Sequence, residues 1–331
     1  MKAPISLKNH QGDDNFHYRL LSYLKKVFPG NIIKLDMIRP TVFLLNSSIG
    51  DYIIKCYSSY NRLKLQEAFT ATLKKEGFTS AYSYLRPGRR EPYYLDGVYL
   101  GIIEFILPHL HSFSYHLDTD RLAGLNLLQN YHSVTEKIVQ RYKTLIPPAR
   151  LIEKWEQRQD RFEANKPVIS YFVNSEMMDE ISGWASFALE GMRRCEGFFT
   201  GEVEAILHGD VAHHNFLRAW NGKIYLIDFD LISIGPPVID YLQYGNRILP
   251  FLNWSINELA KYRQLSAFMN EKGFLFALAY PADLLREWNR IFKNEDEPDI
   301  NTIMQMKKWT ERQFFARHQF IKKIGNMVKS G

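Results

Sequence analysis

The hydrophobic periodicity of the chain changes near residue 107, and this change restricts the fold more than any other feature. Before residue 107, most apolar runs are typical of strands, with a few segments in which apolar residues recur at helical spacing. After it, segments with helical spacing of apolar residues dominate. The runs that predict strands are 32–38, 41–45, 52–57, 93–95, 98–105 and, alone in the second part, 223–228. Those that predict helices are 14–27, 62–75, 122–132, 135–142, 151–162, 177–192, 238–249, 256–271, 282–292 and 300–327. We therefore expect an α+β protein with a β-rich lobe, 1–106, and a helical lobe, 107–331.

Composition excludes several classes of protein. Hydrophobic residues make up 46% and charged residues 24% of the 331 positions, as in an ordinary globular chain. Cys56 and Cys195 are too few for a disulfide framework and favour a reducing compartment. Residues 1–15 lack the apolar run of a signal peptide, and the run 98–107 is too short to span a bilayer. The net charge of +6 permits anionic ligands. Because the sequence has no dense Lys/Arg tract, we do not expect it to bind nucleic acid.

One stretch carries a set of groups suited to phosphoryl transfer. His208-Gly209-Asp210 precedes Asn215 by the spacing of the protein-kinase catalytic loop, and Asp228 ends the strand-like run 223–228. A carboxylate at Asp210 can orient an attacking hydroxyl, while the Asn215 amide oxygen and the Asp228 carboxylate can hold magnesium. Gly209 stands where protein kinases have Arg, and Asp-Phe-Asp replaces Asp-Phe-Gly.

Each residue of this stretch also has a structural interpretation. Asp210 alone could cap a turn, and Asp228 alone could end a strand. Asp230 could be a second metal ligand or could stabilise the following loop. A zinc site is disfavoured, since adjacent histidines at 213 and 214 point in different directions. His208 is expected to hydrogen-bond loop backbone instead.

The expected nucleotide contacts of the first lobe rest on single residues. Lys55 ends a strand and Glu67 lies on the following helix, a pair that could anchor phosphates; Glu76 is the rival partner. No glycine-rich phosphate loop is present, so 39–50 is the candidate phosphate cover. The segment 102–107 could hydrogen-bond an adenine edge or could be an ordinary buried strand.

These motifs resemble the aminoglycoside phosphotransferase and choline kinase group. The resemblance lies in His208-Gly209-Asp210 with Asn215, in Ile227-Asp228-Phe229-Asp230, in Gly50–Lys55, in the helix ending at His132, and in Asp240 after Gly235-Pro236-Pro237. Within that group, the amino-acid sequences of these motifs are most similar to those of the spore-coat-associated kinase-like proteins of endospore-forming bacilli.

The resemblance implies a two-lobed protein-kinase-like fold that uses ATP and Mg²⁺. It implies Asp210 as catalytic base, Asn215 and Asp228 as magnesium ligands, and Lys55 with Glu67 as phosphate anchor. Asp240 would brace the C-terminal lobe.

Two hypotheses on function follow. The first is an ATP- and magnesium-dependent phosphotransferase acting on a hydroxyl of a small molecule or saccharide. The alternative is a non-catalytic kinase-like scaffold protein of the spore coat, although a scaffold needs no complete set of Asp210, Asn215 and Asp228. A metal-dependent hydrolase would need a metal cluster that the motif does not supply. The expected partners are a nucleotide, the acceptor and, in a spore, coat proteins; the expected location is the cytoplasm or the spore coat.

Overall fold

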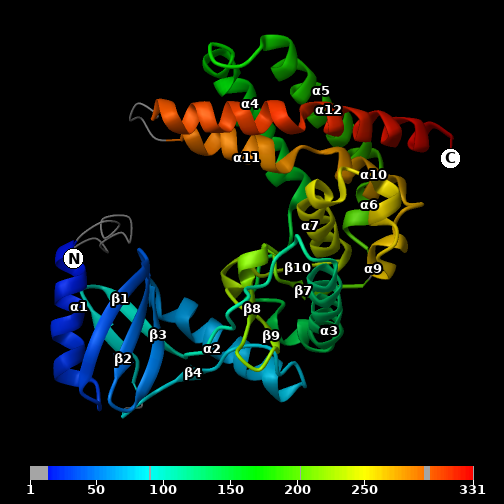
Figure 1. Ribbon diagram of the computed structural model, residues 1–331. Coiled ribbons are helices and arrows are strands. Elements are labelled where there is room, and N and C mark those ends of the chain that lie inside the picture. The colour runs from blue at the N-terminus through cyan, green and yellow to red at the C-terminus, as the bar shows by residue number, and fades with distance from the viewer. Residues whose placement is uncertain (1–13, 89–90, 202, 294–298, 331) are drawn as a thin grey trace. The chain divides into compact units, whose positions relative to one another are not determined.

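The computed structural model describes residues 14–88, 91–201, 203–293 and 299–330 (Figure 1). The polar stretch 1–13 lies outside this range. The chain forms two compact units, which are described separately: unit 1 comprises 1–113 and 214–230, and unit 2 comprises 114–213 and 231–331. The expected lobes 1–106 and 107–331 remain a prediction, because the units follow spatial contacts and assign 214–230 to the N-terminal segment.

Unit 1 is built on an antiparallel sheet of six strands. Its order is β1 (Ile32–Arg39), β2 (Val42–Ser47), β3 (Gly50–Tyr57), β6 (Val98–Glu104) and β4 (Tyr84–Leu85), with β5 (Tyr93–Leu95) also paired to β6. Strands β2 and β3 form a hairpin, and Ser47 pairs with Gly50 across its turn. Gly50 has a φ of 130°, a conformation that glycine tolerates without strain.

Two helices and a short hairpin complete unit 1. Helix α1 (Asp14–Val27) buries Phe16, Leu20 and Leu24 against the sheet. Helix α2 (Tyr60–Lys75) buries the side chains of Leu63, Gln66, Phe69, Thr70 and Leu73, whereas Ala68, expected on or near the same face, is exposed. The hairpin of β8 (Phe216–Arg218) and β9 (Ile224–Leu226) hydrogen-bonds to this unit through the Leu226 amide and the Ser80 carbonyl, 2.8 Å apart.

Unit 2 is mainly helical, with a two-stranded sheet of β7 (Ala205–Leu207) and β10 (Ser233–Gly235). Its longer helices are α3 (Asp118–Tyr142), α4 (Leu151–Ile169), α5 (Ser175–Arg194), α7 (Val238–Ile248), α10 (Lys272–Ala279), α11 (Ala282–Ile291) and α12 (Ile300–Ser330). Short helices are α6 (Glu196–Phe199), α8 (Ile256–Leu259) and α9 (Arg263–Ser266). In Figure 1 the long helix α12 runs beside α11, in agreement with their contacts. The expected class, a sheet-containing N-terminal region and a mostly helical remainder, is confirmed.

Three helix predictions need correction. The expected helices 122–132 and 135–142 are one helix, α3, because its buried stripe continues through Val134 and Thr135 without a break. The expected helix 256–271 is broken into α8, α9 and turns; Tyr262, at the break, is extended and binds Asp118 through its hydroxyl. Helix α10 was missed because nearly all its residues are buried, so it has no amphipathic pattern.

Among the described residues, none of the helices combines the length and the apolar character that a bilayer crossing requires.

Candidate functional site

Lys55 lies at the centre of a charged cluster in unit 1. It is 9% exposed and, as the alternation of β3 predicts, lies on the face opposite to the fully buried Ile54. Its ammonium is 2.7 Å from Asp228 Oδ1 and 2.9 Å from Asp230 Oδ2. Because a buried charge is costly without a partner of opposite charge, the two carboxylates hold the Lys55 ammonium in place.

The turn that carries these carboxylates is held in an uncommon conformation. Asp228 has a φ of 68°, in the left-handed region that non-glycine residues seldom occupy. Gln66 on α2 donates a hydrogen bond of 2.8 Å to the Phe229 carbonyl, and Arg62 approaches Asp230 to within 3.9 Å. Conformations of this kind persist where the surroundings impose them, and they occur often at functional sites.

The donor atoms of this turn fit magnesium. Asp228 and Asp230 supply carboxylate oxygens, and Asp230 Oδ1 is buried with no hydrogen-bond partner in the part of the chain that the structure describes. Asn215 adds an amide oxygen, and Mg²⁺ prefers oxygen ligands and completes its shell with water and phosphates. Among the described residues, no group of three or more His, Cys, Asp or Glu side chains could hold a metal ion. The protein would therefore supply only part of the coordination shell, as in sites where a nucleotide supplies the rest.

Asn215 and Asp228 line one cavity of unit 1. The cavity has a volume of about 330 Å³, within the range of about 300–1,000 Å³ usual for small-molecule sites. Asn215 is almost fully buried, and its main-chain carbonyl accepts a 2.9 Å hydrogen bond from the main-chain amide of Ile227, next to Asp228. The other lining residues are Ile38, Arg39, Val42, Ile53, Lys55, Tyr82, Ile103, Glu104, Phe105, Ile106, Pro108, Leu217 and Ile227. The wall thus combines a largely apolar surface with a few charged and amide groups.

The expected pair of Lys55 and Glu67 is not formed among the described residues. Glu67 is 2.5 Å from Arg86 and 3.3 Å from Lys64. The rival Glu76 caps the C-terminus of α2, whereas the carboxylates that contact Lys55 are those of Asp228 and Asp230. Arg86 was missed by the sequence analysis, because it lies in an irregular segment far from any motif.

In unit 2, Asp240 organises the loop that carries Asp210. The Asp240 carboxylate is completely buried and accepts hydrogen bonds from the His208 amide at 2.7 Å and the Gly209 amide at 3.0 Å. His132 Nε2 lies 2.9 Å from the same carboxylate, while its Nδ1 has no partner among the described residues, so Nε2 carries the donated proton. Burial alone would raise the pKa of Asp240, but the hydrogen bond and charge of His132, helped by His208, lower it overall.

Only glycine fits at position 209. Its φ is 77°, and a Cβ there would lie 2.2 Å from the Leu231 carbonyl oxygen. The expected role of His208 is confirmed, since its Nδ1 accepts a 3.3 Å hydrogen bond from the Asp210 amide. The departure from the protein-kinase motif at this position therefore has a steric reason.

The Asp210 carboxylate is paired with a residue that the sequence analysis missed. Arg247, in the last turn of α7, lies 2.5 Å from Asp210 Oδ1, and both side chains are partly exposed. Nothing in the spacing of Arg247 predicts this contact, because it depends on how α7 packs. A guanidinium at this position fixes the orientation of the carboxylate.

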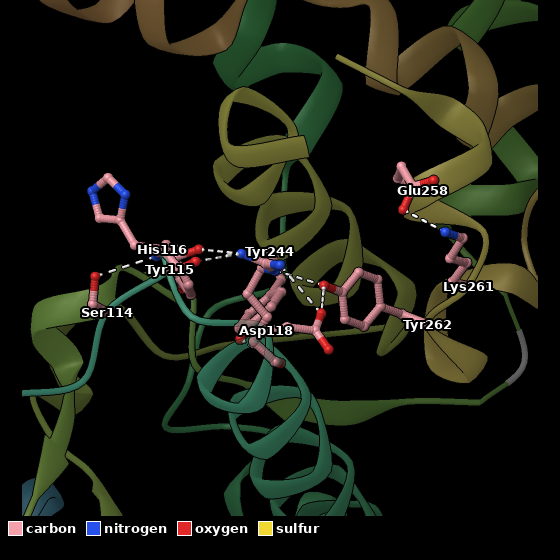
Figure 2. A network of polar contacts seen from close by, with 9 residues as sticks. Ser114, Tyr115, His116, Asp118, Tyr244, Glu258, Lys261 and Tyr262 are labelled. Atoms are coloured by element: carbon pink, nitrogen blue, oxygen red, sulfur yellow. Dashed lines mark hydrogen bonds and ion pairs between the residues drawn. The ribbon is translucent and has the colours of Figure 1, made fainter. Parts of the chain in front are cut away.

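A polar network, buried at Tyr115, Arg121 and Tyr262 and exposed at Asp118, supports the residues that follow Asp210; Figure 2 shows part of it. The Tyr115 hydroxyl donates to the Val211 carbonyl at 2.5 Å. Arg121 Nη1 holds the Tyr115 carbonyl at 2.6 Å, and its Nε lies 2.6 Å from the Tyr262 hydroxyl. Figure 2 shows Tyr262 beside Asp118, whose carboxylate accepts a 2.5 Å hydrogen bond from it. The loop of unit 2 is thus fixed by groups from both α3 and the segment before it.

The comparisons with known proteins concern the family and the fold. Residues 121–272 match the model of the phosphotransferase enzyme family, described as APH. No curated protein sequence matches the chain significantly.

Several solved structures share the fold. An aminoglycoside phosphotransferase from Alicyclobacillus acidocaldarius is 15% identical, with a TM-score of 0.71 over 100% of this chain and 98% of the other. The choline kinase LicA from Streptococcus pneumoniae is 12% identical, with a TM-score of 0.54 over 91% and 99% of the two chains. The spectinomycin phosphotransferase APH(9)-Ia, in an AMP-bound complex, is 12% identical, with a TM-score of 0.59 over 92% and 97%. Residues 121–272 therefore match the phosphotransferase enzyme family, and the chain as a whole has the fold of solved kinase-like phosphotransferases.

Proposed function

We propose that this protein is an ATP- and magnesium-dependent phosphotransferase that acts on a hydroxyl of a small molecule or saccharide. The observation that carries the proposal is the cluster of Lys55, Asp228 and Asp230 beside a largely apolar cavity. The fold relatives support it, since structures in this group are described as complexes with AMP, ADP and GDP.

The cavity of unit 1 is the proposed nucleotide pocket. Its apolar wall suits the faces of a purine, and Ile106, just beyond β6, makes no backbone hydrogen bond to the described residues and can serve the base edge. Lys55 would neutralise phosphate charge, and Asp228 with Asn215 would hold magnesium, which supplies further neutralisation when bound. These assignments remain proposals, as does the phosphate-covering role of 39–50, of which Arg39 and Val42 line the cavity.

Asp210 is the proposed catalytic base. It would accept a hydrogen bond from the acceptor hydroxyl and orient that oxygen for in-line attack. Arg247 would keep the carboxylate in one rotamer, and Asp240 would hold the loop through the His208 and Gly209 amides. A role of Glu67 in anchoring phosphates stays a prediction, although Glu67 pairs with Arg86 and not with Lys55; unchanged ATP affinity in Glu67→Gln would remove it from the nucleotide site.

The decisive experiment is thermal unfolding with and without Mg-ATP. A ligand that binds only the native state at about 100 times its Kd adds about 2.7 kcal/mol of stability, so a rise in Tm of several degrees is expected. Asp228→Ala should lose most of this rise, whereas Asp36→Ala, an exposed acid on β1 of the same unit, should keep it. An unchanged Tm of the wild-type protein in saturating Mg-ATP would leave the non-catalytic scaffold as the better hypothesis.

Association with a spore coat rests on the sequence resemblance alone. Turnover of ATP with a panel of hydroxyl compounds would separate an active enzyme from a nucleotide-binding scaffold.

A further inference from the structure

Helix α4 separates its charges onto two sides. At about 100° per residue, Arg150 at the N-cap and the helical Lys154, Arg158 and Arg161 fall within an arc of about 80°, and this set is called the basic face of α4. The acids lie on another side, at positions 153, 156, 160 and 163. This separation of charge indicates that the two sides of α4 contact different kinds of groups.

The acidic side has structural partners in α5. Glu156 forms a bidentate pair with Arg193, at 2.7 and 2.5 Å, and Glu163 accepts a hydrogen bond from Ser182. By contrast, no ion pair joins the basic face to any described residue. Like charges one turn apart destabilise a helix, as do cations at its positive N-terminal end. The basic face therefore has an electrostatic cost that no ion pair with the described residues of unit 2 offsets.

A further cation on α11 adds to this charge. Arg158 Nη1 donates a 3.0 Å hydrogen bond to the Ala282 carbonyl at the start of α11. Arg286 lies one turn beyond Ala282, on the same side of α11, and it pairs with Glu287 at 3.0 Å. Its positive charge still acts on Lys154 and Arg158, so the positive field of the basic face extends toward α11.

The basic face lies near the proposed catalytic base. The Ala149 amide, just before α4, donates 2.7 Å to the Ile234 carbonyl of β10, the partner of β7, and β7 leads into the loop of Asp210. Burial and the Arg158 charge lower the pKa of Lys154, while the Asp210 carboxylate acts in the opposite direction. Lys154 nevertheless reaches solvent.

We propose that the phosphoryl acceptor is an anionic hydroxyl compound, a sugar acid or a sugar phosphate, whose negative group is bound by the basic face of α4. This inference rests on the proposed function, and it specifies the substrate class. Four cations without acidic partners attract an anion and repel a cationic acceptor, so a positively charged aminosugar is disfavoured.

The test uses one hexose scaffold in three charge states. Glucuronate and glucose 6-phosphate are the anionic probes, glucose is neutral and glucosamine is cationic; binding to the full chain is measured by calorimetry, and phosphorylation by ATP consumption. We expect at least one anionic probe to bind on the order of tenfold more tightly than glucose, with the preference reduced at high salt. The better anionic probe distinguishes a carboxylate from a phosphate.

Variants then locate the binding site. Lys154→Gln should weaken binding of the anionic probe roughly fivefold, and Lys154→Arg should restore it. Arg194→Gln, an exposed and paired arginine on α5, is the matched control and should bind as the wild type does. Lys154 is preferred to Arg158 for this test because Arg158 also holds the Ala282 carbonyl, so its loss affects packing.

The outcomes separate the two proposals. Equal binding of glucose and the anionic probes, no binding of either anionic probe at millimolar concentration, or an unchanged affinity in Lys154→Gln would overturn the inference. A wild-type protein stabilised by Mg-ATP with any of these results would retain the proposed function. Anion binding that depends on Lys154, without any effect of Mg-ATP on stability, would support an anion-binding site on α4. The same result would refute the proposed phosphotransferase activity, and with it the role of the anion as acceptor.

Discussion

Replacing Asp240 by Asn tests the account of the loop that carries Asp210. The native carboxylate accepts three hydrogen bonds: from the His208 amide at 2.7 Å, the Gly209 amide at 3.0 Å and His132 Nε2 at 2.9 Å. Asparagine has the same shape but one acceptor oxygen fewer. Its NH₂ group must face at least one of these three donors, at a side chain that is completely buried.

The magnitude follows from the burial of the group. A buried donor left without an acceptor costs about 1–3 kcal/mol, and removing one partner of a buried charged pair costs about 3–5 kcal/mol. The expected loss in free energy of unfolding for Asp240→Asn is therefore about 3–5 kcal/mol. The variant should also lose phosphotransfer activity, since the His208 and Gly209 amides position Asp210.

Urea unfolding followed by tryptophan fluorescence measures this loss. Five of the six tryptophans lie in unit 2, so the signal reports mainly on the unit that contains Asp240. Asp160→Asn, an exposed acid on α4, is the control and should change stability by less than about 0.5 kcal/mol. A loss below about 1 kcal/mol in Asp240→Asn would refute the bracing role.

The pH dependence gives an independent check. Because the folded-state pKa of Asp240 lies below its ordinary value of about 3.9, its contribution to stability is complete above that value. The contribution is lost only as the pH falls through the folded pKa. The difference in stability between wild type and Asp240→Asn should therefore decrease as the pH falls through that folded pKa. A difference that increased in stronger acid would contradict the assigned direction.

Three further outcomes are expected. Gly209→Ala should lower stability by about 2–4 kcal/mol in thermal melts, because a Cβ at a φ of 77° would lie 2.2 Å from the Leu231 carbonyl oxygen; a melting temperature equal to that of the wild type would disprove the steric argument. Arg247→Gln should lower kcat roughly tenfold with little change in ATP affinity, since it frees the Asp210 carboxylate; steady-state kinetics test this, and an unchanged kcat would count against it. Lys55→Met should weaken ATP binding by about tenfold or more in calorimetry, and tight binding by the variant would exclude Lys55 from the phosphate site.

Local patterns predicted most of the elements but failed where tertiary contacts override periodicity. The strands β1 to β3 and helix α1 appear within a few residues of their predicted ends, because one face of each is buried and the other meets solvent. Helix α10 escaped prediction because it is buried almost all round. The helix expected over 256–271 is broken at Tyr262, whose hydroxyl binds both Asp118 and Arg121.

For the candidate site too, local sequence patterns predicted some residues and missed those whose role depends on tertiary contacts. Asp210, Asn215 and Asp228 were predicted because a spacing of a few residues along the chain carries their chemistry. Residues that act through contacts across long sequence separations left no such signal. Arg247, which pairs with Asp210, and Arg86, which holds Glu67, are of this kind.

The sequence by itself thus determined the chemistry that the chain can offer: an oxygen-rich set for magnesium, a candidate base, and a strand lysine of the right alternation. Only the tertiary structure decided the partners of these groups. It paired Lys55 with Asp228 and Asp230 rather than with Glu67, and it required glycine at 209 because the Leu231 carbonyl lies so close. The physical reason is that spacing along a chain limits local geometry, whereas ion pairs and steric contacts depend on packing between distant segments.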